Sequence, residues 1–237
     1  MAHTLQNVSF KTVRSTWPRT CGCLTGSVGT IGPQLCHRYT RQQREGADRG
    51  ELRSQDGGPG VRPLASDPPH EGKSGGSPRD LEDPATRVED LRCGVDYLTM
   101  LDSVDAERIG IVGAAQAGYE VNAGMTEHRI KAVGTVTAVN LGRAFRQADT
   151  SSADAVAATL KAVGAQRAAE ARGAEQRRDP LLPDTAESAE AIGITDRDML
   201  EAVEFYRTPR GYSERSTNRL LFTSNATILG FGADSMS

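Results

Sequence analysis

The stretch "ERIGIVGAAQAGYE", residues 107 to 120, predicts a buried strand, a tight turn and the start of a helix. Its first part, "RIGIV" (108 to 112), is short, apolar and rich in β-branched residues, which is typical of a buried parallel strand. The turn (113 to 117) contains only glycine, alanine and one glutamine, and a helix is expected from about 118 to 127. Because α/β enzymes place a nucleophile or bind a phosphate at such a turn, it is the first candidate functional site.

The sequence on either side of this stretch predicts an α/β architecture. Asp83 is suited to cap a helix and Pro84 to occupy its first turn, and an apolar face follows at helical spacing, made of Val88, Leu91, Val95, Leu98 and Leu101. The run "IKAVGTVTAV" (130 to 139) predicts the next strand. This alternation of helix and strand indicates a mostly parallel sheet with crossover helices.

The C-terminal third predicts a helical insertion. Residues 151 to 178 form an alanine-rich segment with Ser151 or Ser152 at its cap, a thin apolar stripe and a stop at Asp179–Pro180. We expect a surface or lid helix there. The run "TDRDMLEAVEFY" (195 to 206) predicts a second helix, with a capping box formed by Thr195 and Asp198.

Composition excludes several classes of function. The net charge of −3 gives no global basic field for nucleic acid or a membrane surface. No run of about 18 apolar residues is present, and the N-terminus lacks an apolar signal core, so a cytoplasmic location is expected.

Residues 1–75 are expected to be a low-order N-terminal segment, separate from a domain over 76–237. From residue 13 to 80 the chain is rich in proline, glycine and scattered arginine, and neither a strand nor a helix period persists. Such a segment buries too little apolar surface to offset its ordering entropy. It is either a disordered interaction arm or a loop-like segment without a partner.

Two motifs in this region suggest ligands that their spacing does not support. The run "HEGKSGG" (70 to 76) contains Gly-Lys-Ser, but Asp67 stands where a P-loop requires glycine, and we expect no apolar strand before it. The cysteines Cys21, Cys23, Cys36 and Cys93 lack the paired spacing of a zinc site, which favours free thiols. No metal and no cofactor is therefore expected.

A family resemblance is carried by the runs "DLEDPATRVEDLRCGVDYLTMLDSVDAERIGIVG" (80 to 113) and "MTEHRIKAVGTVTAVNLGRAFR" (125 to 146). They resemble dienelactone-hydrolase-like α/β hydrolases. The run "FYRTPRGYSERSTNRLLFTSNATILGF" (205 to 231) looks more narrowly like the fungal polyketide transferases of secondary-metabolite clusters, including toxin pathways. The resemblance covers about residues 76 to 232. It implies a partial α/β-hydrolase fold with a lid at about 140–215, a largely irregular N-terminal part, and chemistry on acyl chains.

The resemblance gives each turn residue a role. In these hydrolases the turn is a nucleophile elbow, in which small flanking residues let strand and helix approach and the next backbone N–H helps form the oxyanion hole. Gly113 and Ala117 take the small positions, Ala115 takes the nucleophile position, and Gln116 supplies the N–H. The family's serine or cysteine is thus replaced by an alanine, which cannot attack a carbonyl.

The other triad members are also not found. His128 is the only histidine after Ala115, and it precedes the next predicted strand, at the end of the sheet away from the elbow. We therefore expect it to be a surface loop residue. The chain ends at Ser237, before the strands whose ends would hold the acid and the base. Tyr119 and Cys93 lie nearby in sequence, but neither is placed at the turn.

Three functional hypotheses follow. The chain is an acyl (polyketide) transferase or thioester or ester hydrolase with impaired catalysis; or a non-catalytic protein that binds an acyl ligand or acts as a scaffold; or a truncated product without function. The expected partner is a small acyl or polyketide molecule, free or carrier-bound, and a homodimer is allowed. The run "EFYRTPRGYSERSTNRL" (204 to 220) suits either an anionic carrier or a solvated lid face.

Overall fold

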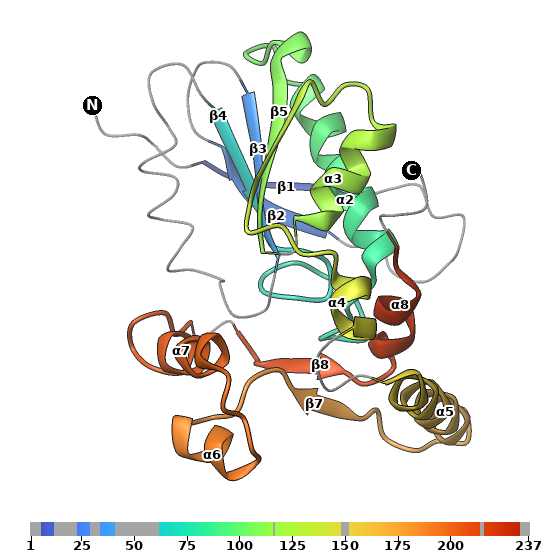
Figure 1. Cartoon of the computed structure of the whole chain (residues 1–237). Helices are drawn as coiled ribbons and strands as arrows, with labels where there is room; N and C mark the ends of the chain where they lie inside the picture. The colour runs from blue at the N-terminus through green and yellow to red at the C-terminus, as the bar shows by residue number, and fades with distance from the viewer. Residues whose placement is uncertain are drawn as a thin grey trace.

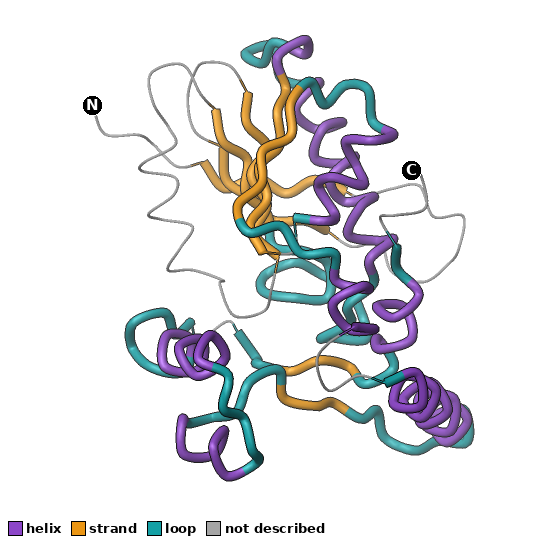
Figure 2. The backbone as a smooth tube through the Cα atoms, in the orientation of Figure 1, coloured by secondary structure: helices purple, strands orange, loops and turns teal. Residues whose placement is uncertain are grey.

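The computed structural model describes residues 6–11, 23–28, 34–40, 62–115, 117–147, 152–213 and 216–232. A twisted sheet forms the upper part of the molecule in Figure 1, with helices α2 and α3 packed beside it. The lower part holds a short two-stranded sheet surrounded by helices (Figure 2).

The main sheet has six strands in the order β1-β2-β4-β3-β5-β6. Strand β2 is antiparallel to both β1 and β4, whereas β4, β3, β5 and β6 run parallel to one another. The strands span Gln6–Lys11 (β1), Cys23–Val28 (β2), Gln34–Thr40 (β3), Arg62–Ser66 (β4), Ile109–Ala115 (β5) and Ala132–Val136 (β6). This is the mostly parallel sheet that the sequence predicts.

Helices α2 and α3 form as the sequence predicts. Helix α2 spans Pro84–Thr99, and the side chain of Asp83 caps it by accepting a hydrogen bond from the Ala85 amide. Its apolar stripe is buried together with Ile109 and Ile111 of β5 in one core. Helix α3 spans Gly118–Thr126 and packs against α2, β5 and β6. A 3-10 turn, η1 (Ala106–Arg108), leads into β5.

The insertion leaves the sheet after β6 and ends at α8. Its elements are α4 (Leu141–Gln147), α5 (Ala153–Glu170), β7 (Arg178–Pro180), α6 (Ala186–Ala191), α7 (Arg197–Tyr206), β8 (Arg219–Leu221) and α8 (Ser224–Gly230). Helices α4 and α8 lie side by side (Figure 1). A Cβ at Gly142 would collide with the Phe231 carbonyl oxygen, and Arg146 donates to the carbonyls of Leu229 and Phe231.

Two local predictions in the insertion are wrong. Helix α5 ends at Glu170 instead of continuing to 178, and Asp179–Pro180 lies in β7, which pairs with β8. The N-cap of α7 is Asp196, whose side chain accepts from the Met199 amide, so Thr195 and Asp198 form no capping box. The helix begins at Arg197, which places the Asp196 carboxylate, and not the Thr195 hydroxyl, next to a free amide of the first turn. Ser152 caps α5 as expected.

The first 75 residues contribute four strands to the same sheet as β5 and β6. The composition of residues 13–80 did not predict β2, β3 or β4. The rest of residues 1–61 lies outside the described part of the chain, and its expected low order stays a prediction. No helix in the described ranges is long and apolar enough to cross a membrane.

Candidate active site

The turn after β5 takes the chain from strand to helix within two residues. Ala115 is the last residue of β5, and α3 begins at Gly118. Ala117, between them, is fully buried. Gln116 lies outside the described residues, so its expected role as an oxyanion donor stays a prediction, as does the vacant nucleophile position at Ala115.

Gly113 of β5 leaves room for a buried side chain of α3. A Cβ built at Gly113 would lie 2.5 Å from Cδ of Glu120, a residue of α3 with 1% of its surface exposed. Real Cβ atoms do not approach a carbon so closely, so any larger residue would displace the Glu120 side chain or the helix. Gly118 is also confined, because its Cβ would lie 2.9 Å from the Val139 carbonyl oxygen.

The turn lies at the carboxyl edge of the parallel strands. Because β3, β4, β5 and β6 are parallel, their ends at Thr40, Ser66, Ala115 and Val136 share one edge of the sheet. Ligands of α/β proteins bind outside this edge. The loop after β4, residues 67–80, begins at this edge.

This loop is compact and uses its polar groups internally. The Asp67 carboxylate accepts from the Lys73 amide at 2.9 Å, and the Ser74 hydroxyl donates to the Asp67 carbonyl at 2.6 Å. The Arg79 guanidinium donates to the carbonyls of Gly72 and Ser74. The amide and hydroxyl that a P-loop would offer to phosphate thus bind Asp67. A strand, β4, does precede this motif, contrary to the sequence-based expectation.

His70 of the same loop is buried, and its ring binds the main chain of the loop. Its Nδ1 lies 2.8 Å from the Pro78 carbonyl oxygen, so Nδ1 carries the proton and donates it. Burial lowers the pKa of His70 below its ordinary value of 6.5, and the positive charges of Arg87 and Arg79 act in the same direction.

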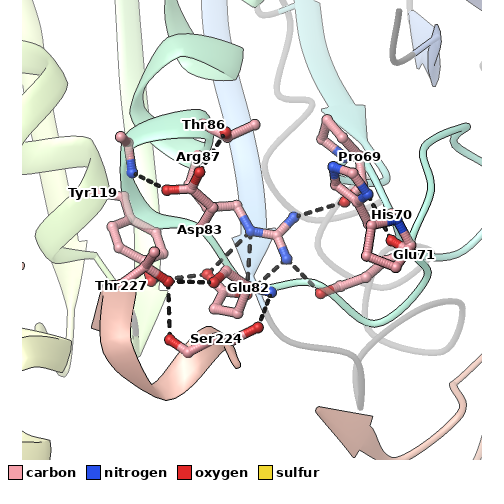
Figure 3. A network of polar contacts seen from close by, with 12 residues as sticks. Pro69, His70, Glu71, Glu82, Asp83, Thr86, Arg87, Tyr119, Ser224 and Thr227 are labelled. Carbon is pink, nitrogen blue, oxygen red and sulfur yellow. Dashed lines mark hydrogen bonds and ion pairs between the residues drawn. The ribbon is translucent and has the colours of Figure 1, made fainter. Parts of the chain in front are cut away.

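A buried cluster of charges connects this loop to α2 (Figure 3). Arg87 of α2 forms ion pairs with Glu71 and with Glu82, the latter at 2.6 Å. The side chains of all three are almost completely buried. Burial disfavours the charged guanidinium, but the two carboxylates more than compensate and hold the pKa of Arg87 well above its ordinary value.

The cluster extends to α3 and α8. The Tyr119 hydroxyl donates to the Glu82 carboxylate at 2.8 Å, and the Tyr119 ring meets Phe231 edge-on at 5.3 Å. The Glu82 amide donates to the Ser224 hydroxyl, and the Thr227 hydroxyl donates to the Glu82 carbonyl. Sequence analysis missed this cluster. The available signal was Arg87, a charged residue four positions before Leu91 on the apolar stripe of α2.

The other sequence candidates do not gather at the turn. His128 is exposed in the loop before β6, as expected, at the edge opposite Ala115. Cys93 is buried within α2, and the Tyr119 hydroxyl is bound by Glu82. The side chains of Cys23 and Cys36, like all of Cys21, lie outside what the structure describes. Within the described ranges, no group of three His, Cys, Asp or Glu residues is arranged to hold a metal ion.

Two arginines of residues 204 to 220 bind acids of the insertion itself. Arg207 pairs with Asp184 at 2.6 Å. Arg210 pairs with Glu204 at 2.7 Å and lies over the Phe205 ring. Both contacts fit the solvated lid face, and binding of an anionic carrier stays a prediction.

Two proteins of known sequence resemble the chain over about two thirds of its length, whereas no family model matches it. An uncharacterized protein of Escherichia coli K12, YcjY, is 37% identical over 169 residues, which are 67% of this chain and 54% of that protein. The uncharacterized protein PA2218 of Pseudomonas aeruginosa is 32% identical over 158 residues, 65% of this chain and 41% of that protein. The chain thus spans about half the length of the curated relatives it matches.

Solved structures resemble almost the whole chain. The crystal structure of PA2218 superposes with a TM-score of 0.84 at 23% identity over 97% of this chain and 72% of that one. DcsB, solved with a substrate analogue, gives 0.76 at 20% identity over 97% and 75%. The α/β hydrolase GrgF from Penicillium sp. sh18 gives 0.74 at 18% identity over 97% and 74%. With the strand order and the turn after β5, these likenesses show that the chain has the α/β-hydrolase fold.

Proposed function

We propose that the chain is an α/β-hydrolase-fold protein of the acyl-transfer class, with impaired catalysis. Its ligand is an acyl thioester or ester, free or carrier-bound, and the narrower assignment is to polyketide transfer in fungal secondary metabolism. The observation that carries the proposal is the turn from β5 to α3 at the carboxyl edge of the sheet, with Ala115 at its strand end. A hydrolase of this fold presents its nucleophile there.

The impairment follows from the residue type. Acyl transfer through a covalent intermediate requires a hydroxyl or thiol, and alanine has neither. A thiol is the most informative replacement, because a few per cent of it is thiolate at neutral pH and it is nucleophilic without a base. The variant Ala115→Cys therefore tests whether the turn presents a side chain to an acyl group.

The test is acylation of Ala115→Cys by the hexanoyl thioester of N-acetylcysteamine, followed by intact mass. The introduced sulfur attacks the carbonyl carbon, a new C–S bond forms, the original C–S bond breaks, and N-acetylcysteamine leaves with the proton. We expect one hexanoyl group per chain and saturable kinetics. The unsubstituted chain should show no saturable acylation by this thioester.

Native thiols are removed for this test by replacing Cys21, Cys23 and Cys36 with serine and Cys93 with alanine. The matched control is Ala157→Cys, which places a thiol on the exposed surface of α5. Equal, non-saturable labelling of Ala115→Cys and Ala157→Cys would contradict the proposal, because it would report only the reactivity of an exposed thiol.

Ala115 itself favours a second function, binding of an acyl ligand without turnover. This function predicts that a thioether analogue of the same probe, which cannot be cleaved, raises the melting temperature of the unsubstituted chain in a concentration-dependent manner. A melting temperature that stays constant up to the solubility limit of the analogue would eliminate this alternative.

A further inference from the structure

Glu82 connects segments that are distant in sequence. Its carboxylate accepts from Tyr119 of α3 and from Arg87 of α2. Its main chain binds Ser224 and Thr227, both in α8 (Figure 3). One residue thus connects the helix that begins at the turn with the helix that ends the insertion.

Tyr119 transmits this connection to the turn. It lies in the first turn of α3, four residues after Ala115, and only 1% of its surface is exposed. Its hydroxyl lies 2.8 Å from the Glu82 carboxylate. A shift of this helix end moves the end of β5, because the two elements are joined by only two residues and Gly113 packs directly against Glu120.

Stability alone does not account for a cluster of this kind. A buried ion pair is often no more stabilising than apolar residues of equal volume, since desolvation offsets the attraction of the charges. What a buried, hydrogen-bonded cluster provides is a fixed geometry. Arg87 lies between Glu71 and Glu82 and holds both the loop at the carboxyl edge and the residue that binds α3.

We propose that Glu82 is a positioning residue: through Tyr119 it fixes the start of α3, and with it the turn after β5, relative to α8. The expected effect on acylation rests on the proposed function, whereas the expected effect on the start of α3 does not. The positioning role predicts that the start of α3 is protected by the Glu82 side chain and the start of α8 by the Glu82 main chain, so that each can be loosened without the other.

The test is amide hydrogen exchange of the full chain, read by mass spectrometry on peptides of α3 and α8. Tyr119→Phe removes one hydroxyl and should accelerate exchange in α3 about tenfold while α8 is unchanged, as expected for one lost buried bond. Ser224→Ala should do the reverse. Glu82→Gln keeps the main-chain bonds to α8, so it should accelerate exchange in α3 alone. The control Arg92→Ala removes an exposed bond to Thr126 at the other end of α3 and should leave its first turn unchanged.

Uniform acceleration throughout the chain in Tyr119→Phe, or no acceleration in α3, would overturn the proposal. These two outcomes do not depend on Glu82→Gln, which is the variant most prone to misfolding because it leaves Arg87 with fewer partners.

A second measurement separates positioning from a purely structural role. In the Ala115→Cys chain, Tyr119→Phe should lower the maximal acylation rate about tenfold, the same order as one lost bond, and leave the half-saturating thioester concentration unchanged. An unchanged maximal rate would overturn the positioning role. If Ala115→Cys itself is not acylated, the proposed function fails, and the exchange pattern alone decides whether Glu82 positions α3.

Discussion

At the residue scale, the absence of a side chain at Gly113 leaves room for the buried side chain of Glu120 in α3. We expect Gly113→Ala to destabilise the fold by about 1–3 kcal/mol, because its methyl group would lie 2.5 Å from Cδ of Glu120. Urea unfolding measures the loss. The control is Gly164→Ala in α5, where a Cβ meets nothing within 4 Å and the helix gains about 0.5–1 kcal/mol. A loss of stability in both variants would show that packing at Gly113 is not the cause.

A second prediction at this scale concerns the pH dependence of Glu127. Hydrogen bonds from the Arg129 guanidinium lower the pKa of Glu127 to about 2, from an ordinary value of 4.5. Because the folded-state pKa lies below the unfolded one, the contribution to stability is complete above 4.5 and is lost as pH falls toward 2. The stability difference between the wild-type chain and Glu127→Gln should shrink across that window.

Unfolding free energies measured from pH 5 down to pH 2 test this dependence. Asp102→Asn changes an exposed acid with no ion pair in the described part of the chain, and it serves as the control. A constant difference between wild type and Glu127→Gln across the window would mean that the bond to Arg129 is not formed in solution.

At the element scale, the start of α7 distinguishes the structure from the sequence motif. The Asp196 carboxylate accepts from the Met199 amide at 2.8 Å. Asp196→Ala should therefore destabilise α7 by about 0.5–2 kcal/mol. Thr195→Ala should change it by less than about 0.5 kcal/mol, as for most surface substitutions. Exchange of the α7 amides measures both, and a larger effect at Thr195 would restore the capping box that the sequence suggested.

The elements that sequence predicts are those whose signals are local. Asp83, Pro84 and the stripe from Val88 to Leu98 specify α2 without reference to any other segment. Strands β2, β3 and β4 were missed because what identifies them is pairing with distant strands, such as Cys36 opposite both Leu64 and Ile111. The turn after β5 was predicted, but the bonds around Glu82 were not, since they join residues up to 145 positions apart.

At the scale of the whole molecule, Asp80 connects the loop after β4 with strands β7 and β8 of the insertion. Its carboxylate binds Arg178 of β7 at 3.0 Å and accepts from Thr217 at 2.7 Å, and its carbonyl accepts from the Leu221 amide. Asp80→Ala removes both side-chain bonds. We expect trypsin to cleave after Arg178 about tenfold faster, because loss of about 1.4 kcal/mol of local stability raises the open population by that factor.

The matched control for this cleavage is Asp184→Ala, which removes an exposed ion pair with Arg207 within the insertion. Such a pair contributes little, so its loss should leave the cleavage rate unchanged. If the two variants are cleaved equally fast, the insertion is held by other contacts and Asp80 is not its main attachment.

The contact between Gly142 and Phe231 has a consequence for modularity. The chain leaves the sheet at α4, and α8 packs against α4, so the segment between them starts and finishes at one place. An excursion with adjacent ends can be exchanged for another of different length while the strands it leaves behind stay in register. The junction of α4 and α8 is therefore an insertion point of the α/β framework, at which evolution or design can replace the inserted segment.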